Sequence, residues 1–402
     1  MPQSSDLPLI LFGAFDRHNF GDLLLAEISA SVLRHRPLVF AGLAERDLTA
    51  FGGRKVRSIA EVAREWGDQP ADVVQTGGEI LTCSLYEAAV MLLSQEAARQ
   101  AIACHDADQA ARQAWSEELL GLHQQVAYLV PRSLFRRPRK FQYFGIGGTE
   151  LATVPMSMRQ EVFANLQHAG HVWVRDRVTQ APLEQARIRT FLAPDPAAAT
   201  ARLCRSRIAS HRVNGEPAAV AARFPRGYLA TQFSAEFGDD ATLHEIGCQL
   251  QQAQGATGLG IVLFRAGAAP WHDDLDVYRR LLVATPELDA VLAESLDLWD
   301  ICALLANATA NCGSSLHGRI VAEACGRPAV NLVREASRMT KQAAHALSWG
   351  YGSLPTVLAP ADLATGVIAI LQEKTSAFDA HVENLADLVI AAFTRAQLAR
   401  ES

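Results

Sequence analysis

The sequence predicts an α/β protein with two domains, each built on a parallel sheet. Short apolar runs rich in β-branched or aromatic residues recur along the chain, and each is followed by a turn and a longer segment with helical periodicity. This alternation is typical of parallel sheets covered by helices. It occurs in two series that meet near residue 200, and a length of 402 residues favours two or three domains over one.

The first series defines an N-terminal domain, residues 1–200. Its candidate strands are Leu9 to Phe12, Leu38 to Ala41, Val73 to Thr76, Gln142 to Ile146, His171 to Val174 and a short one near Phe191, and helices are expected to start near Asp22, Ile59, Tyr86 and Ser157. Residues 84–140 have a largely helical pattern and end in an arginine-rich run, so we expect a helical insertion there. We interpret this charge run as a solvated loop. Contact with an anionic acceptor or with a membrane surface is the alternative.

The second series defines a C-terminal domain, residues 201–360. Its candidate strands lie around Tyr228 to Gln232, Gly260 to Phe264, Asp289 to Val291, Ala308 to Asn311 and Ala329 to Leu332. Between the two series, residues 193–216 have the prolines, the alanine run and the Asn-Gly pair of a connection. Residues 361–402 are predicted to form a C-terminal helical segment that packs back across the first domain.

Composition narrows the functional classes. The chain has 37 basic and 43 acidic residues, a net charge of -6, which argues against a nucleic-acid partner. Its seven cysteines are scattered, without a C-x-x-C pair, which favours reduced thiols in the cytoplasm. No window is apolar and long enough for a membrane helix, and the N-terminus lacks the pattern of a signal peptide. We therefore expect a cytoplasmic location, and the oligomeric state is left unassigned.

Polar residues follow the first predicted strand, at the strand end where open α/β sheets bind ligands. Asn19 and Gly21 suit a tight turn, and Asp22 is either a helix N-cap or a ligand-binding carboxylate.

Two later strands are followed by paired glycines, Gly77-Gly78 before Glu79 and Gly147-Gly148 before Thr149. Glycine lets a backbone approach a ligand and offer its N–H groups, although simple turns use it as well. Neither pair belongs to a Walker A loop or a G-x-G-x-x-G fingerprint, which argues against ATP hydrolysis and dinucleotide redox chemistry.

Arg175 and Asp176 end another predicted strand. The arginine can bind a carboxylate or phosphate bidentately, and the aspartate either caps a helix or orients Arg175. An ion pair that holds no ligand is the alternative.

Residues 311–330 have the pattern of a strand, a polar turn, a helix, a glycine stop and a further strand. Ser314 or Ser315 is expected to cap the helix, so that its N–H groups and dipole meet an anion. His317, in the first helical turn, then acts as a general acid or a cationic clamp, with a structural histidine as the alternative.

The acidic run His272-Asp273-Asp274-Leu275-Asp276 resembles a metal cluster or the D-x-D of sugar-nucleotide enzymes. Acidic residues in the first turn of a helix are explained by the helix dipole alone, so no metal is expected.

Taken in order, these segments resemble the polysaccharide pyruvyl transferase family. The matching motifs are Asn19-Phe20-Gly21-Asp22, Thr76-Gly77-Gly78-Glu79, Gly145-Ile146-Gly147, Val174-Arg175-Asp176, Asp195-Pro196 and Ser314-Ser315-Leu316-His317-Gly318, over residues 10–335. The resemblance implies a GT-B-like fold whose two Rossmann-like domains face a central cleft. It also implies transfer of a pyruvyl group from phosphoenolpyruvate onto sugar hydroxyls of a cell-envelope or exopolysaccharide glycan, as a ketal, without metal or cofactor.

The resemblance also suggests roles for the residues. His317 is the candidate acid or phosphate clamp, Asp22 the candidate base and Glu79 its reserve. Arg175, Arg319 and the helix N-terminus at Ser315 are expected to bind the donor, and the remaining binding positions are Asn19, Gly21, Gly77, Gly78, Gly147, Ser314 and Gly318.

One departure from the family pattern concerns the donor. Many members have Arg-Leu-His-Gly where this chain has Ser315 at the arginine position, and Arg319, one helical turn on, is expected to compensate. His317→Ala and Arg175→Ala are each expected to abolish transfer with little change in melting temperature.

Two other functions stay open. A GT-B glycosyltransferase with a nucleotide-sugar donor would need a base-stacking aromatic and a ribose-binding acid in the second domain, and Glu323 is one such acid. A non-catalytic binding protein is the third reading, supported by Ser315 in place of arginine. The acceptor sugar and its linkage are not indicated.

Overall fold

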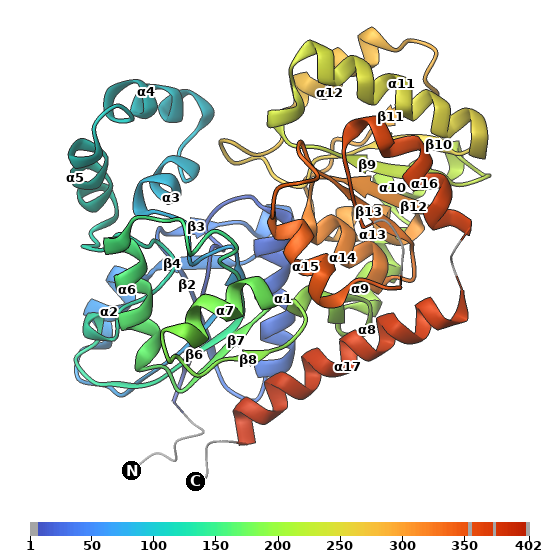
Figure 1. Ribbon diagram of the computed structural model, residues 1–402. Helices are drawn as coiled ribbons and strands as arrows, with labels where there is room; N and C mark the ends of the chain where they lie inside the picture. The colour runs from blue at the N-terminus through green and yellow to red at the C-terminus, as the bar shows by residue number, and fades with distance from the viewer. Residues whose placement is uncertain (1–6, 353–355, 373–374, 399–402) are drawn as a thin grey trace. The chain divides into compact units, whose positions relative to one another are not determined.

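The computed structural model describes residues 7–352, 356–372 and 375–398. The described chain forms two compact units (Figure 1). Unit 1 extends to Pro196 and includes the end of the last helix from Leu388, and unit 2 comprises Ala197 to Asp387. Each unit is an α/β structure built on its own sheet, as the sequence predicts.

The sheet of unit 1 has the strand order β3-β4-β2-β1-β5-β6-β7-β8. Its strands are β1 (Leu9–Phe12), β2 (Leu38–Gly42), β3 (Arg46–Asp47), β4 (Lys55–Ser58), β5 (Ala71–Gly78), β6 (Pro138–Ile146), β7 (His171–Val174) and β8 (Phe191–Leu192). Its helices are α1 (Phe20–Leu33), α2 (Ile59–Trp66), α3 (Leu85–Met91), α4 (Gln95–His105), α5 (Gln109–Leu120), α6 (Met156–Gln167) and α7 (Arg177–Gln185). The strands pair in parallel except β3 with β4. β1 is buried along its whole length, because parallel strands carry helices on both faces.

The predicted insertion consists of α3, α4 and α5, which pack on a small core of their own around Tyr86, Val90 and Ala98 (Figure 1). A capping box between Ser84 and Glu87 starts α3. The insertion ends earlier than the expected residue 140, since β6 already begins at Pro138. Part of the arginine-rich run is therefore strand rather than solvated loop, and Arg139 forms an ion pair with Asp72.

The sheet of unit 2 is parallel throughout, with the strand order β11-β10-β9-β12-β13-β14. Its strands are β9 (Tyr228–Gln232), β10 (Gly260–Leu263), β11 (Ala290–Leu292), β12 (Ala310–Gly313), β13 (Ala329–Leu332) and β14 (Val357–Leu358). Its helices are α8 (Thr200–Leu203), α9 (Arg205–Arg212), α10 (Gly215–Arg223), α11 (Asp240–Thr257), α12 (Leu275–Ala284), α13 (Leu298–Asn307), α14 (Leu316–Ala324), α15 (Lys341–Trp349), α16 (Leu363–Gln372) and the start of α17 (Ser376–Leu398). The two-residue strand β14 has no clear signature in the sequence.

The stretch expected to be a connection is helical. Residues 200–212 form α8 and α9, and the glycine of the Asn214-Gly215 pair begins α10 rather than a loop. α9 packs on α13, whose residues are almost all buried. The alanine run of the expected connection forms a short 3-10 helix, Pro196–Ala199, directly before α8.

The C-terminal segment is divided between the units. α16 contributes Leu363, Val367 and Ile370 to the core of unit 2. The end of α17 belongs to unit 1, where Phe393 stacks on Phe144 of β6 with the ring centroids 4.3 Å apart. The expected return of the chain end to the first domain is therefore made by this last part alone. Within the described residues, every helix is too short or too polar to cross a bilayer.

Each sheet reverses its strand order at one point. In unit 1 the chain proceeds from β1 to β2 on one side and to β5 on the other, and in unit 2 it proceeds from β9 to β10 on one side and to β12 on the other. Open α/β sheets bind ligands at the carboxyl ends of the strands flanking such a switch point. The polar motifs predicted from the sequence follow β1, β5 and β12, so the fold places them at these two positions.

Candidate functional site

The residues at the switch point of unit 1 form what we call the β1/β5 cluster: Asn19 and Asp22 after β1, Gly78 and Glu79 at the end of β5, and Arg175 after β7. Asn19 is the N-cap of α1, and its Oδ1 accepts a hydrogen bond from the backbone N–H of Asp22 at 3.2 Å. Asp22 is therefore not the cap, and its carboxylate points instead toward Gly78. A Cβ on Gly78 would lie 3.2 Å from Asp22 Oδ1, and the φ of +85° there also favours glycine.

Arg17, which sequence reasoning did not single out, organises one side of this cluster. Its guanidinium donates hydrogen bonds to Asp22 Oδ2 at 3.2 Å and to the Tyr128 hydroxyl at 3.0 Å. The Tyr128 hydroxyl donates in turn to Asp16, whose other carboxylate oxygen accepts from the backbone N–H groups of Leu43 and Ala44. Arg17 was visible in the loop after the first strand, but Tyr128 lies 111 residues away and only the fold brings it there.

Glu79, Gly147 and Arg175 form the other side of the cluster. Arg175 is 1% exposed, and its guanidinium lies 2.6 Å from Glu79 Oε2 and 3.2 Å from Asp195 Oδ2. Gly147 makes room for this pair, because a Cβ there would lie 2.6 Å from Arg175 Nε. Burial acts against the charge of Arg175, but the carboxylates around it, Glu79 foremost, raise its pKa.

These contacts change the role expected for Arg175. Its guanidinium is committed to carboxylates of the protein, including Asp176 at 3.9 Å, so it does not offer a bidentate grip to a donor. It fixes Glu79, whose side chain remains 22% exposed. Asp176 caps α7 by accepting from the backbone N–H of Thr179.

The two other glycines predicted in this region are buried. Gly21 is buried in the first turn of α1. A Cβ on Gly77 would lie 2.8 Å from Leu25 of α1 and 3.1 Å from the carbonyl oxygen of Gly145 in β6. Gly77 therefore allows β5 to approach its neighbours, and contact with a ligand is not needed to explain it.

The residues at the switch point of unit 2 form what we call the β9/β12 cluster: Gln232 at the end of β9, and Ser314, Ser315, His317 and Gly318 after β12. Ser315 is the N-cap of α14, and its side chain accepts from the backbone N–H of Gly318 at 3.1 Å. Ser314 instead accepts, through its Oγ, from the backbone N–H of Ser234 at 3.0 Å. His317 is partly exposed in the first turn of α14, where the N–H groups of a helix are directed outward.

Arg319 does not lie where it could replace the donor-binding arginine that many family members have at the position of Ser315. It is fully buried, and its guanidinium contacts Asn331 Oδ1 at 2.7 Å, His345 Nδ1 at 2.9 Å and Glu323 Oε1 at 3.4 Å. Asn331 donates to the carbonyl oxygens of Gly313 and Ser315. Arg319 therefore supports the turn before α14 from inside, and the expectation that it contacts the donor is wrong for this geometry.

The acidic run after β10 is committed to the fold. Asp273 accepts from Gln232 Nε2 at 2.7 Å and from the backbone N–H of Ala266 at 2.6 Å, and burial raises its pKa to about 7. Asp274 caps α12 through the backbone N–H of Asp276. Among the described residues, one group of possible metal ligands has its ligand atoms within 4.8 Å of one another. It consists of His211, Asp297 and Asp300, of which Asp297 is the N-cap of α13.

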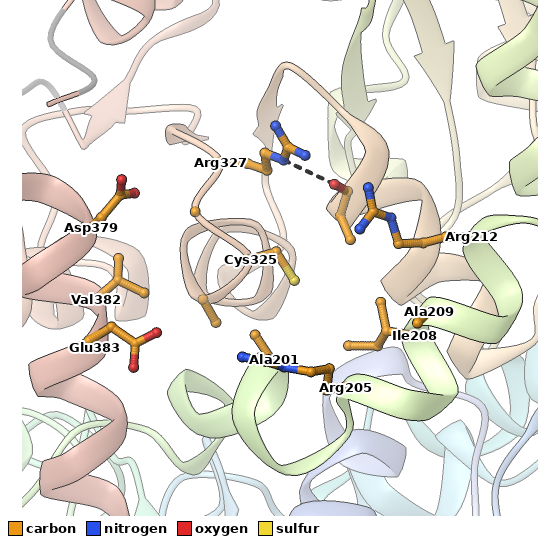
Figure 2. A pocket seen from close by; sticks show the side chains of 13 residues that line it. Ala201, Arg205, Ile208, Ala209, Arg212, Cys325, Arg327, Asp379, Val382 and Glu383 are labelled. Atoms are coloured by element: carbon orange, nitrogen blue, oxygen red, sulfur yellow. Dashed lines mark hydrogen bonds between the residues drawn. The ribbon is translucent and has the colours of Figure 1, made fainter. Parts of the chain in front are cut away.

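A pocket of about 360 Å³ lies elsewhere in unit 2, between α9, α17 and the ends of α13 and α14 (Figure 2). Arg212 donates through Nε to Asn307, and Arg327 donates through Nε to the carbonyl oxygen of Ala306 (dashed in Figure 2). Arginines at the C-terminal ends of helices stabilise the unsatisfied carbonyl groups there. The pocket contains none of the predicted site residues, and its Arg327 is explained by the end of α13.

Comparison with known proteins gives a family and a fold. The model of the polysaccharide pyruvyl transferase family matches residues 116–335. No curated protein matches the chain. Among solved structures, the UDP-N-acetylglucosamine 2-epimerase from Rickettsia bellii has 11% identity and a TM-score of 0.56, covering 98% of this chain and 96% of that one. The epimerase from Neisseria meningitidis, bound to UDP-GlcNAc, has 10% identity and a TM-score of 0.53, covering 98% and 100%. At these identities the likeness shows the fold alone.

Proposed function

Because this chain belongs to the polysaccharide pyruvyl transferase family, we propose that it transfers a pyruvyl group from phosphoenolpyruvate onto sugar hydroxyls of a cell-envelope or exopolysaccharide glycan. The observation that carries this proposal is the position of His317. It stands in the first turn of a helix that begins at the switch point of the unit 2 sheet. A helix N-terminus favours an anion, and a phosphate and a carboxylate are the recognisable groups of the donor.

The reaction requires an acid, a base and a leaving phosphate. Protonation of the methylene carbon of phosphoenolpyruvate makes its central carbon electrophilic, and a sugar hydroxyl then adds there and gives up its proton. A second hydroxyl of the same glycan displaces inorganic phosphate and closes a cyclic ketal. In this scheme His317 supplies the proton or holds the phosphate, with preorganised donors stabilising the developing charge.

In unit 1, Asp22 is the proposed base for the acceptor hydroxyl. Its carboxylate lies in the first turn of α1, the residue is 8% exposed, and Arg17 holds the carboxylate in place at 3.2 Å. Glu79 is the reserve, because Arg175 holds it in place while its side chain stays accessible. The scheme needs a small-molecule donor and a glycan acceptor, and neither a metal nor a cofactor.

A nucleotide-sugar glycosyltransferase is the second candidate, and one observation favours it. Trp271, in the loop after β10, is 49% exposed and available to stack on a base. The acid expected to bind the ribose is less suitable, because Glu323 is paired with the buried Arg319. The Neisseria epimerase with a similar fold binds a nucleotide sugar, so the architecture accommodates one.

A thermal-shift panel distinguishes these functions, since a ligand that binds only the folded state raises the melting temperature. Phosphoenolpyruvate, UDP- and GDP-sugars and CMP-sialic acid are compared at equal concentrations. A shift with phosphoenolpyruvate alone supports pyruvyl transfer, and a shift with a nucleotide sugar supports glycosyl transfer. Release of inorganic phosphate that depends on a glycan acceptor then tests turnover, which a non-catalytic binding protein would lack.

A further inference from the structure

Arg265 lies at the same edge of the unit 2 sheet as the β9/β12 cluster. It follows β10 by two residues, and β10 pairs with β9. The backbone is fixed on both sides of it, because the N–H of Phe264 donates to Thr231 and the N–H of Ala266 donates to Asp273. The strand end therefore determines where this arginine stands.

The guanidinium of Arg265 has no hydrogen-bond or ion-pair partner among the described residues, and its Nε atom is buried from solvent. Arg334, which follows β13 at the same edge, differs, since it forms an ion pair with Asp239 at 2.8 Å. A partly buried cation without a partner destabilises a fold. Such a group is explained when a ligand supplies the missing acceptors.

Asp273 is the carboxyl group close enough to influence Arg265, and it does not serve as a full counter-ion. Both of its oxygens accept hydrogen bonds, from Gln232 and from the backbone of Ala266. Burial raises the pKa of Asp273 to about 7, so a large fraction of it is uncharged at neutral pH. Asp273 therefore compensates the positive charge of Arg265 only in part.

The loop that carries Arg265 has a defined conformation. The N–H of Asp273 donates to Gly267 at 3.2 Å and that of His272 donates to Ala269 at 3.1 Å. Trp271 has a φ of 64°, a conformation that costs energy in a residue other than glycine and is concentrated at functional sites. Gln232 joins this loop to α14, since it donates to Asp273 and accepts from the N–H of Ser315.

We infer that Arg265 binds the anionic group of the donor, a phosphate or a carboxylate, at the edge of the sheet where α14 begins. The inference rests on the proposed function for the identity of the donor. Arg265 thus supplies the cation for the donor that was expected of Arg319, which is buried. The planar guanidinium offers a fork suited to two oxygens of one anion.

The test compares Arg265→Gln and Arg265→Lys with a matched control, Arg279→Gln. Arg279 is an exposed arginine of α12 in the same unit, 4.0 Å from Glu294. Dissociation constants of phosphoenolpyruvate, UDP and inorganic phosphate are measured by titration calorimetry, together with the melting temperature of each variant. We expect Arg265→Gln to weaken phosphoenolpyruvate binding by about 10-fold or more. We expect the affinity of Arg265→Lys for phosphoenolpyruvate to lie between that of Arg265→Gln and that of the control, which should equal wild type.

The outcomes separate this inference from the proposed function. Equal affinity of wild type and Arg265→Gln for phosphoenolpyruvate overturns the inference and leaves pyruvyl transfer intact. Binding of UDP but not phosphoenolpyruvate overturns the proposed donor, and a loss of UDP affinity in Arg265→Gln then still supports the arginine as the anion-binding residue. Wild type that binds none of the three anions, or two Arg265 variants that both melt well below wild type, overturns the inference.

Discussion

Gln232 accepts a hydrogen bond from the backbone N–H of Ser315 through its Oε1 atom, at 2.8 Å. This bond joins the end of β9 to the first residue before α14, across the switch point of the unit 2 sheet. The Nε2 atom of the same side chain donates to Asp273. A single amide thus sets the position of the turn that carries His317 and of the loop that carries Arg265.

Gln232→Leu removes both of these hydrogen bonds without a large change in volume. It leaves the N–H of Ser315 and the Oδ1 atom of Asp273 without this partner, while Asp273 Oδ2 keeps its bond from Ala266. Each buried unsatisfied group costs about 1–3 kcal/mol. We therefore expect the free energy of unfolding in urea to fall by roughly 2–4 kcal/mol and transfer activity to fall with it. Gln251→Leu is the control, because Gln251 of α11 makes a surface hydrogen bond to Glu287. Equal stability of the two variants would show that the Gln232 bridge is unimportant.

His317→Ala tests the proposed acid or phosphate clamp. The side chain is partly exposed on the first turn of α14, and the helix cap is made by Ser315 rather than by His317. We expect transfer to be lost while the melting temperature stays within a few degrees of wild type. His244→Ala, on α11, is the control for loss of a histidine away from the cluster. A large drop in melting temperature would instead assign His317 a structural role.

The sequence alone predicts that Arg175→Ala abolishes transfer with little change in melting temperature, whereas the structure predicts a loss of stability as well. The substitution leaves Glu79, Asp176 and Asp195 close together without their cation. Breaking a buried ion pair by removing one partner costs about 3–5 kcal/mol, so we expect a clear loss of stability as well as activity. Denaturant unfolding measures this loss, with Arg64→Ala, at an exposed arginine of α2, as the control. An unfolding midpoint of Arg175→Ala equal to that of wild type would show that the ion-pair cluster does not contribute to stability.

The sequence was sufficient to predict the sheets and the strand ends that carry polar groups. Helices α1, α2, α3 and α6 begin within two residues of their expected starts, because apolar periodicity and capping residues are local signals. The partners of the site residues could not be predicted in the same way. Whether Arg175 and Arg319 reach a ligand or a protein group depends on Asp195 and Asn331, which other strands bring to them. Arg17 and Arg265 were missed because neither lies in one of the motifs, and because the groups near them, Tyr128 and Asp273, are brought there by the fold.

Chelation tests the expectation that no metal takes part. Asp273 and Asp274 are engaged in hydrogen bonds to Gln232, to the backbone and at the start of α12, so they are not arranged to converge on an ion. We expect the rate of phosphate release to be the same before and after treatment with a chelator and removal of the chelate. Loss of the rate with recovery on adding a divalent ion would contradict this, and Asp274→Asn would then show whether the acidic run is responsible.

The pH dependence of stability tests the state of Asp273. Its pKa is raised from 3.8 to about 7, mainly by burial, so between these values the folded state keeps a proton that the unfolded state has released. The stabilising contribution is therefore complete below about pH 4 and is lost as the pH rises through about 7. We expect the free energy of unfolding of wild type, taken relative to Asp273→Asn, to decrease by on the order of 4 kcal/mol over this range.

Asp274→Asn is the matched control for this measurement, because asparagine also caps a helix and the residue lies next to Asp273. Its unfolding curve is expected to follow that of wild type at every pH. Parallel curves for wild type and Asp273→Asn would mean that the carboxyl group titrates alike in the folded and unfolded states. Asp273 would then be a full counter-ion for Arg265 at neutral pH, and the case for an anion at that arginine would weaken with it.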